Sequence, residues 1–148
     1  MNNENNKKSL FKKIDCISLP VTDIDSGIEF YKKLGHECIW RENDTAAGLR
    51  MSDSDTEIVI HTKQLPMETY LLVESVNDAI KQIISAGGKI EVGPVEIEAG
   101  LYARLKDPWN NTLVIMDLTK GTLKTDSTGN VIGNNSNFEV YNIKSEQG

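Results

Sequence analysis

The chain has few cysteines, no clustered basic residues and no long hydrophobic run, and each deficit excludes a class of protein. Cys16 and Cys38 are the only cysteines among 148 residues. Two cysteines can form one disulfide, but small secreted domains that depend on disulfides contain several. We therefore expect two buried free thiols. The net charge is −6, and no lysine- or arginine-rich stripe is present. Because phosphate backbones require clustered cations, we expect no nucleic-acid partner.

Membrane-spanning and targeting segments are also missing from the pattern. The longest apolar runs, such as residues 113–116 (LVIM), are far shorter than the ~20 residues that a membrane span needs. Residues 1–8 contain no apolar core like that of a secretory signal. We therefore expect a cytoplasmic protein without a membrane partner.

The composition is that of one soluble globular domain with polar ends. Hydrophobic residues make up 39% of the chain and charged residues 26%. The first residues are rich in asparagine and lysine, whereas Thr, Ser, Asn and Gly dominate after Leu118. We expect a flexible N-terminus (1–11), one domain (12–118) and a polar, partly ordered extension (119–148), in which residues 128–131 can turn a small hairpin.

The strongest positive signal is an internal repeat with an offset of 52 residues (73 minus 21). Residues 21–28 (VTDIDSGI) are echoed by residues 73–80 (VESVNDAI), and Gly35 and Leu19 align with Gly87 and Leu71 at the same offset. A repeat of this length indicates one supersecondary unit used twice, and its seam is a natural place for a binding site.

Each copy begins with a strand-like run that leads into a capped helix. In the first copy a strand over 13–20 precedes Asp23, a helix N-cap, and an apolar helical stripe that ends at Gly35. In the second copy a strand over 69–74 precedes the cap at Ser75 and a helix closed by Gly87. Strands follow at 37–41, 46–51 and 57–62 in the first copy and at 89–92, 101–106 and 112–117 in the second. The pattern predicts an α+β fold of two tandem βαβββ modules, about 12–62 and 66–118.

Several short motifs resemble those of the glyoxalase/bleomycin resistance protein/dioxygenase superfamily, also called the vicinal oxygen chelate (VOC) superfamily. They are LPVTDI at 19–24 with Phe30-Tyr31 and Leu34-Gly35, then AGG at 86–88, GPV at 93–95 and DPWNN at 107–111. The last is similar to an Asp-Pro-x-Gly-Asn turn with Asn110 in place of glycine. The resemblance implies two βαβββ modules around a shared cleft that binds a small molecule, often in a homodimer.

The resemblance also implies a divalent metal (Zn, Ni, Mn or Fe) in the enzymes of the family, held by His, Glu or Gln side chains. The implied ligand positions fall on Cys16, Ile60, Glu68 and Val114, and isoleucine and valine have no donor atom. Two donors are too few for a catalytic metal, so we expect no cofactor. A slip of one residue replaces Ile60 with His61 and gives the alternative set Cys16, His61 and Glu68. That slip turns the side chain to the other sheet face, and His61 is otherwise expected at the surface.

Strand alternation and aromatic side chains nominate further residues of the cleft. Ser18 lies on the same strand face as Cys16. In the predicted strand 101–106 one face carries Tyr102 and Arg104, and the other carries apolar residues typical of a core. Arg104 either pairs with an anionic ligand group or lies on an exposed sheet face. The complete set of cleft candidates is Cys16, Ser18, Trp40, Ile60, Glu68, Tyr70, Tyr102, Arg104, Trp109 and Val114.

Three functions are compatible with these features. The first is a metal-free protein that binds a small organic molecule in its cleft, and the acidic balance favours a cationic ligand. The second is a glyoxalase-type lyase or isomerase, or a dioxygenase, with a rearranged metal site. The third is a non-catalytic structural or regulatory homodimer. We favour the first.

Overall fold

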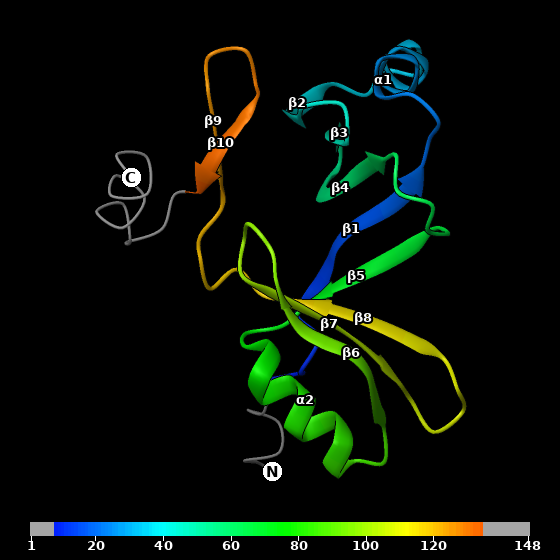
Figure 1. Ribbon diagram of the computed structural model, residues 1–148, viewed down its shortest axis with the longest axis vertical. Helices are drawn as coiled ribbons and strands as arrows, with labels where there is room; N and C mark the ends of the chain where they lie inside the picture. The colour runs from blue at the N-terminus through cyan, green and yellow to red at the C-terminus, as the bar shows by residue number, and fades with distance from the viewer. Residues whose placement is uncertain (1–7, 135–148) are drawn as a thin grey trace.

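A computed structural model describes residues 8–134, and the predicted β-α-β-β-β order occurs twice within them (Figure 1). The α+β fold predicted from the repeat is therefore confirmed. The first module contains β1 (Lys13–Pro20), α1 (Ile24–Lys33), β2 (Cys38–Glu42), β3 (Ala46–Met51) and β4 (Ser54–His61). The second contains β5 (Glu68–Leu72), α2 (Val76–Ser85), β6 (Lys89–Glu96), β7 (Leu101–Lys106) and β8 (Thr112–Met116). A hairpin of β9 (Leu123–Thr125) and β10 (Val131–Asn134) follows.

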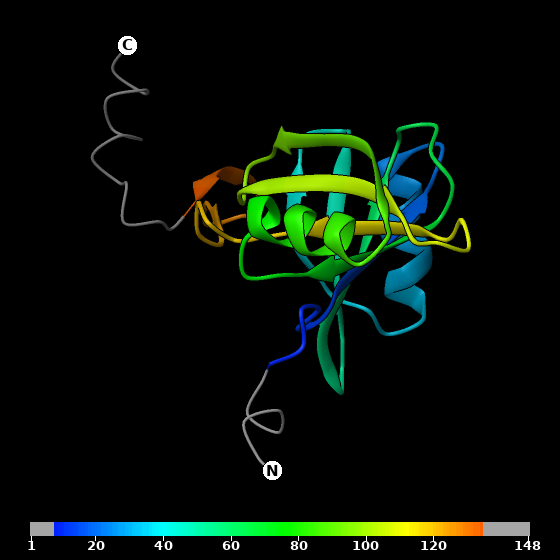
Figure 2. The ribbon, with the colours of Figure 1, turned by 90° about the horizontal axis from the view of Figure 1, so that it is seen from below.

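The strands of the two modules form one mixed sheet in the order β2-β3-β4-β1-β5-β8-β7-β6. Within each module the first strand lies parallel to the last, as β1 does to β4 and β5 to β8. The modules are joined through the antiparallel pair β1 and β5. The two helices lie at opposite ends of the molecule, α1 with the first module and α2 with the second (Figure 1). The view from below has α2 in front (Figure 2).

The two hydrophobic clusters under the helices decide which sheet face is free for a site. One cluster joins α1 to β3 and β4, and the other joins α2 to β7 and β8. Their buried members are Ile24, Ala47, Leu49 and Ile60 in the first and Val73, Val76, Ala79, Ile83, Ala103, Leu105 and Ile115 in the second. Because alternate strand residues point to opposite faces, the other face of the sheet remains available to a ligand.

The helix ends confirm the caps that the repeat predicted. The Asp23 carboxylate accepts a hydrogen bond from the Ser26 amide at 2.8 Å, and the Ser75 hydroxyl accepts one from the Asp78 amide at 3.2 Å. After each helix the chain turns at a glycine with a positive φ angle. These glycines are Gly35, with a φ of 96°, and Gly87, with a φ of 113°. The paired caps and glycines explain why both copies adopt the same local structure.

The predicted turn at 128–131 forms the β9–β10 hairpin. The Arg41 amide donates to the Gly129 carbonyl at 2.8 Å, so the hairpin covers part of the outer edge of β2. The expected flexible start and the rest of the extension fall mostly on residues 1–7 and 135–148, which lie outside the described residues. Both cysteines are free thiols; Cys16 is buried and Cys38 is half-buried. Neither helix in the described part of the chain is long and apolar enough to cross a membrane.

Candidate functional site

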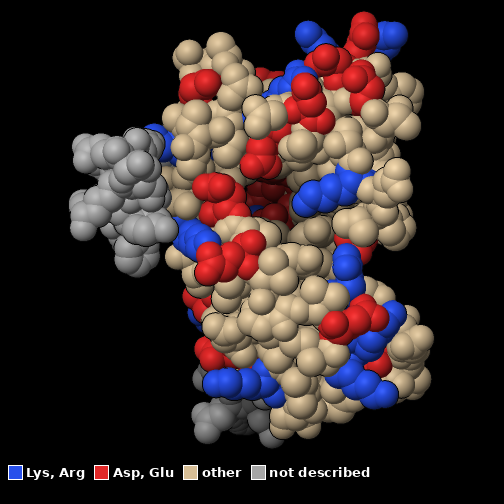
Figure 3. Space-filling model, in the orientation of Figure 1, with Lys and Arg blue, Asp and Glu red and all other residues tan. Residues whose placement is uncertain are grey.

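A cavity of ≈ 510 Å³ lies on the sheet face that the helices leave uncovered. Residues from both modules and from the β9–β10 hairpin line it, and Figure 3 shows acidic side chains around a hollow in the middle of one face. This volume falls in the range of roughly 300–1,000 Å³ that is usual for small-molecule sites.

Two β-bulges bring adjacent residues of one strand into the cavity. The register of β1 with β5 shifts just before Cys16, and the register of β2 with β3 shifts just before Trp40. As a result Asp15 and Cys16 both line the cavity, and so do Ile39 and Trp40. In a regular strand, adjacent side chains point to opposite faces of the sheet, so they cannot both line one cavity. A bulge changes the direction of one side chain, and bulges are common beside binding sites.

Four carboxylates from different segments line the cavity, namely Asp15, Glu42, Glu57 and Glu98. Burial raises the pKa of Glu57, and the nearby charge of Asp15 raises it further, whereas a hydrogen bond from Trp40 opposes the rise. Burial also raises the pKa of Asp15. These two carboxyl groups are therefore destabilised as anions, and a positive charge placed in the cavity would stabilise them.

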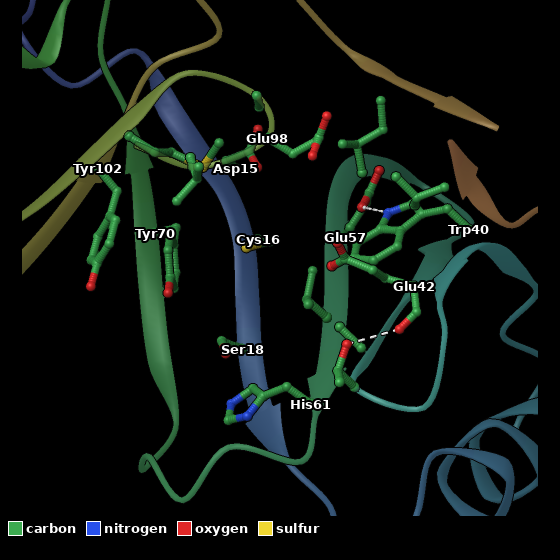
Figure 4. Close-up of a pocket in the computed structure, with 18 of the residues that line it drawn as sticks. Asp15, Cys16, Ser18, Trp40, Glu42, Glu57, His61, Tyr70, Glu98 and Tyr102 are labelled. Carbon is green, nitrogen blue, oxygen red and sulfur yellow. Dashed lines mark hydrogen bonds between the residues drawn. The ribbon is translucent and has the colours of Figure 1, made fainter. Parts of the chain in front are cut away.

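Aromatic rings stand on both sides of the cavity (Figure 4). The rings of Tyr70 and Tyr102 lie side by side, with centroids 6.4 Å apart and planes tilted by 34°. On the other side the indole of Trp40 donates to a Glu57 carboxylate oxygen at 2.8 Å. Burial raises the pKa of Tyr70 to about 12, so its phenol stays protonated at neutral pH. The indole fits against Gly48, where a Cβ atom would lie 1.9 Å from the Trp40 Nε1.

The opposite end of the cavity is polar and contains a buried ion pair. Arg104 donates to Glu68, and only 16% and 11% of their side chains are exposed. His61 is 6% exposed, and neither of its ring nitrogens has a hydrogen-bond partner within residues 8–134. The second oxygen of Glu68 is likewise buried without a partner in this part of the chain. Burial lowers the pKa of His61, and the charge of Lys63 lowers it further. An interaction with the Lys63 backbone and the charge of Glu68 oppose this shift without reversing it. The neutral ring therefore offers one donor and one acceptor at neutral pH.

The structure places several of the predicted cleft residues along one cavity. Cys16, Ser18, Trp40, Tyr70, Tyr102 and Arg104 line it. Arg104 is not an exposed sheet residue, because only 16% of its side chain is exposed, and Glu68 pairs with it. His61, which we expected at the surface, is buried and also lines the cavity.

The predicted position of Ile60 is wrong by one residue. Ile60 is fully buried in the core beneath α1 and does not face the cavity. Strand pairing places Val59 beside Ser18 and Val114 beside Tyr70. Because Ser18 and Tyr70 are equivalent in the repeat, Val59 is the counterpart of Val114. The predicted strand 57–62 contains no local signal that fixes this register, since apolar residues occupy both of its faces.

Three other candidates lie outside the cavity lining. Trp109 is 79% exposed in the turn between β7 and β8, where Asn110 adopts a φ of 72°. Val114 is 3% exposed and does not line the cavity. It pairs with Arg104 across the β7–β8 ladder, so its side chain lies on the same sheet face as the cavity. Glu68 also is not a lining residue and is linked to the site through its ion pair with Arg104.

The donor atoms do not fit the metal centre that the resemblance implies. With the observed register the four positions are Cys16, Val59, Glu68 and Val114, and both valines lack a donor. Glu68 is engaged in its ion pair, and burial raises the pKa of the Cys16 thiol, whereas a metal binds the thiolate. Across residues 8–134 no three His, Cys, Asp or Glu side chains form a group that could hold an ion, and this includes the alternative set with His61.

Sequence reasoning missed the acidic lining residues and the wall made by the hairpin. Glu57 follows from alternation along β4 once the register is known, since it shares a face with Val59 and His61. Asp15 lines the cavity because of a bulge in β1 that no sequence pattern predicts. The hairpin supplies Leu123, Thr125 and Val131, and Thr122 directly precedes it; all four lie in a weakly patterned segment.

Comparison with known proteins supports the fold. The family model described as the Glyoxalase/Bleomycin resistance protein/Dioxygenase superfamily matches residues 13–115. A search of curated proteins finds no match.

Solved structures with a similar fold come from proteins with different described activities. A methylmalonyl-CoA epimerase from Mycobacterium tuberculosis matches with a TM-score of 0.61 and 15% identity, over 75% of this chain and 91% of that one. A protein described as an NAD-dependent benzaldehyde dehydrogenase from Legionella pneumophila matches with a TM-score of 0.58 and 22% identity, over 70% and 97%. A variant of homoprotocatechuate 2,3-dioxygenase from B. fuscum matches with a TM-score of 0.52 and 15% identity, over 93% and 54%. At identities this low the likeness shows the shared fold alone.

Proposed function

We propose, from the premise that this chain belongs to the glyoxalase/bleomycin resistance protein/dioxygenase superfamily, that its cavity binds a small organic cation without a metal ion. The observation that carries the proposal is the charge of the lining. Asp15, Glu42, Glu57 and Glu98 are acidic, whereas the described lining cations are Lys63 and Arg104, of which Arg104 is paired with Glu68. Such a site attracts a cation.

The aromatic side chains define which kind of cation suits the site. Trp40, Tyr70 and Tyr102 offer ring faces and edges on two sides of the cavity. Aromatic rings attract cations through their quadrupole and stack with planar ligands. A planar aromatic or quaternary ammonium cation therefore uses both the rings and the carboxylates.

The polar end of the cavity adds a second requirement on the ligand. His61 and one oxygen of Glu68 are buried without hydrogen-bond partners among the described residues. Buried polar groups in proteins nearly always have partners, and leaving them unpaired costs about 1–3 kcal/mol each. A ligand with a hydroxyl, amine or amide at the end remote from its charge would pair with these atoms and gain affinity.

Ligand binding can be tested with 1-methylquinolinium and benzyltrimethylammonium as cations, and with benzoate and benzyl alcohol as charge controls. In a Trp109→Phe background Trp40 is the single tryptophan, so its fluorescence reports on the cavity. We expect both cations to raise the melting temperature and change Trp40 emission, with benzoate and benzyl alcohol much weaker. Equal binding of benzoate would contradict the proposal.

Glu57→Gln is the matched variant, because an amide oxygen can still accept the hydrogen bond from Trp40. We expect it to weaken cation binding about tenfold, or ~1.4 kcal/mol. Glu91→Gln on the exposed strand β6 is the control and should leave affinity unchanged. Because the pKa values of Asp15 and Glu57 are raised, protons compete with the cation, and affinity should fall as the pH is lowered below neutral. Loss of binding in EDTA would contradict the metal-free site.

We also propose a cytoplasmic homodimer as the working form. Strand β6 lies at the end of the sheet, and all eight of its residues are exposed, including Ile90, Val92 and Val95. An uncovered edge strand with apolar side chains favours association. Light scattering should give twice the mass of the chain, and a monomer at micromolar concentration would contradict this part of the proposal.

A further inference from the structure

One wall of the cavity comes from a segment beyond the family match. The match ends at residue 115, whereas the cavity lining includes Thr122, Leu123, Thr125 and Val131. The last three residues belong to the β9–β10 hairpin. The hairpin thus lies outside the two βαβββ modules, and it contacts the space in which a ligand would lie.

The segment beyond the family match is anchored to both modules. On the second module the Lys120 amide donates to the Ala99 carbonyl at 2.8 Å, and the Lys120 ammonium pairs with Glu96 at 2.8 Å. On the first module the Gly129 carbonyl accepts from the Arg41 amide at 2.8 Å. The segment therefore crosses from one module to the other beside the cavity (Figures 1 and 4).

The hairpin has a well-supported turn, so its shape does not depend on a ligand. One carboxylate oxygen of Asp126 accepts from the Thr128 amide at 2.9 Å, the Thr128 hydroxyl at 2.8 Å and the Asn130 amide at 3.0 Å. Gly129 completes the turn with a φ of 91°. A turn with these contacts presents a fixed surface rather than a loop that moulds itself to any ligand.

The two faces of β10 differ in what they contact. Val131 pairs in register with Thr125, and both line the cavity. The next residue, Ile132, is 51% exposed and does not line it. Alternation along the strand thus places one side chain against the ligand space and its neighbour away from it.

We propose that the β9–β10 hairpin is a specificity wall that sets the upper size of the ligand, admitting cations with one or two rings and excluding larger ones. The proposal rests on the proposed function for the identity of the ligand, but the position of the wall can be tested without any ligand. Removing the wall would leave the ligand space bounded mainly by the sheet and open at one side. The hairpin therefore distinguishes this cavity from one that the paired modules alone would build.

Paired substitutions on β10 test the wall with ligands. Val131→Phe places a larger ring in the cavity, and Ile132→Phe makes the same change on the outer face. Calorimetry with 1-methylquinolinium should show at least tenfold weaker binding to the first variant and unchanged binding to the second. Val131→Ala should improve the affinity for ethidium, a larger cation, relative to 1-methylquinolinium. Equal effects of the two phenylalanine variants, or no change in the affinity ratio with Val131→Ala, would overturn the proposal.

Acrylamide quenching of Trp40 in the Trp109→Phe background tests the wall when no cation binds at all. Asp126→Ala removes the contacts that hold the turn, and Lys124→Ala is the control on the same hairpin. We expect the quenching constant of Trp40 to rise at least twofold with Asp126→Ala and to stay unchanged with Lys124→Ala, while far-UV circular dichroism of the core is retained. Unchanged quenching with Asp126→Ala would overturn the wall. Failure of every cation to bind, combined with the quenching increase, would refute the proposed function and leave the wall in place.

Discussion

Replacing Arg104 with methionine should destabilise the protein by about 3–5 kcal/mol, because it leaves the Glu68 carboxylate buried without the guanidinium. The side chain of Glu68 is only 11% exposed, and that of Arg104 is 16% exposed. One oxygen of Glu68 already lacks a hydrogen-bond partner in the described part of the chain, so Arg104 supplies the ion pair of this carboxylate. Most of the cost is therefore the uncompensated charge.

The same reasoning predicts how a second substitution rescues the first. With Glu68→Leu added to Arg104→Met, the charge is gone and most of the lost stability should return, since apolar replacements of a buried pair are often nearly neutral. Arg50→Met is the exposed control, because the side chains of Arg50 and its partner Glu37 are 58% and 71% exposed. We expect that control to lose less than about 1 kcal/mol.

Thermal and urea unfolding followed by circular dichroism measure these differences. For a chain of this size about 3 °C of melting temperature corresponds to 1 kcal/mol, so Arg104→Met should melt roughly 10–15 °C lower. A loss below about 1 kcal/mol for Arg104→Met would show that the pair behaves as an exposed one. A double variant no more stable than the single one would show that packing, rather than the buried charge, accounts for the loss.

Three further predictions concern packing, polar contacts and thiol reactivity. Gly48→Ala should displace Trp40, because the added methyl group would lie 1.9 Å from the indole Nε1. We expect the free energy of unfolding to fall by about 1–3 kcal/mol and the near-UV circular dichroism spectrum to change, and an unchanged spectrum would contradict this prediction. Asp117 is 1% exposed, and its carboxylate accepts hydrogen bonds from three backbone amides and a hydroxyl. Asp117→Ala should therefore lower the free energy of unfolding in urea by about 3 kcal/mol or more, and a change near zero would refute this prediction. In a Cys38→Ser background, Cys16 should react with iodoacetamide much more slowly in the native protein than in urea, because burial limits access to the thiol and raises its pKa. Labelling of the native protein as fast as that of the unfolded chain would contradict this.

The repeated fold was predictable because local interactions specify it. Asp23 and Ser75 cap their helices through contacts three residues away, and Gly35 and Gly87 supply the positive φ that ends each helix. These signals need no distant partner, so they are visible in the chain as two copies 52 residues apart (73 minus 21). The alternation on β7 likewise indicated that Tyr102 and Arg104 share a face, and both line the cavity.

The site itself depended on contacts between segments far apart in the chain. Pairing with β1 set the register of β4 and moved the predicted ligand position from Ile60 to Val59, because both faces of that strand carry apolar residues. Bulges against β5 and β3 turned Asp15 and Ile39 toward the cavity.

Long-range pairing also explains the remaining features of the cavity. Glu68 and Arg104 are 36 positions apart and meet only because β5, β8 and β7 are neighbours in the sheet. The hairpin reaches the cavity because Gly129 bonds to β2, which a weakly patterned sequence does not reveal. Helix caps and turns act over a few residues and can be recognised in the sequence. Strand register, bulges and the charge of a cavity arise when distant segments pair, so they appear only in the folded chain.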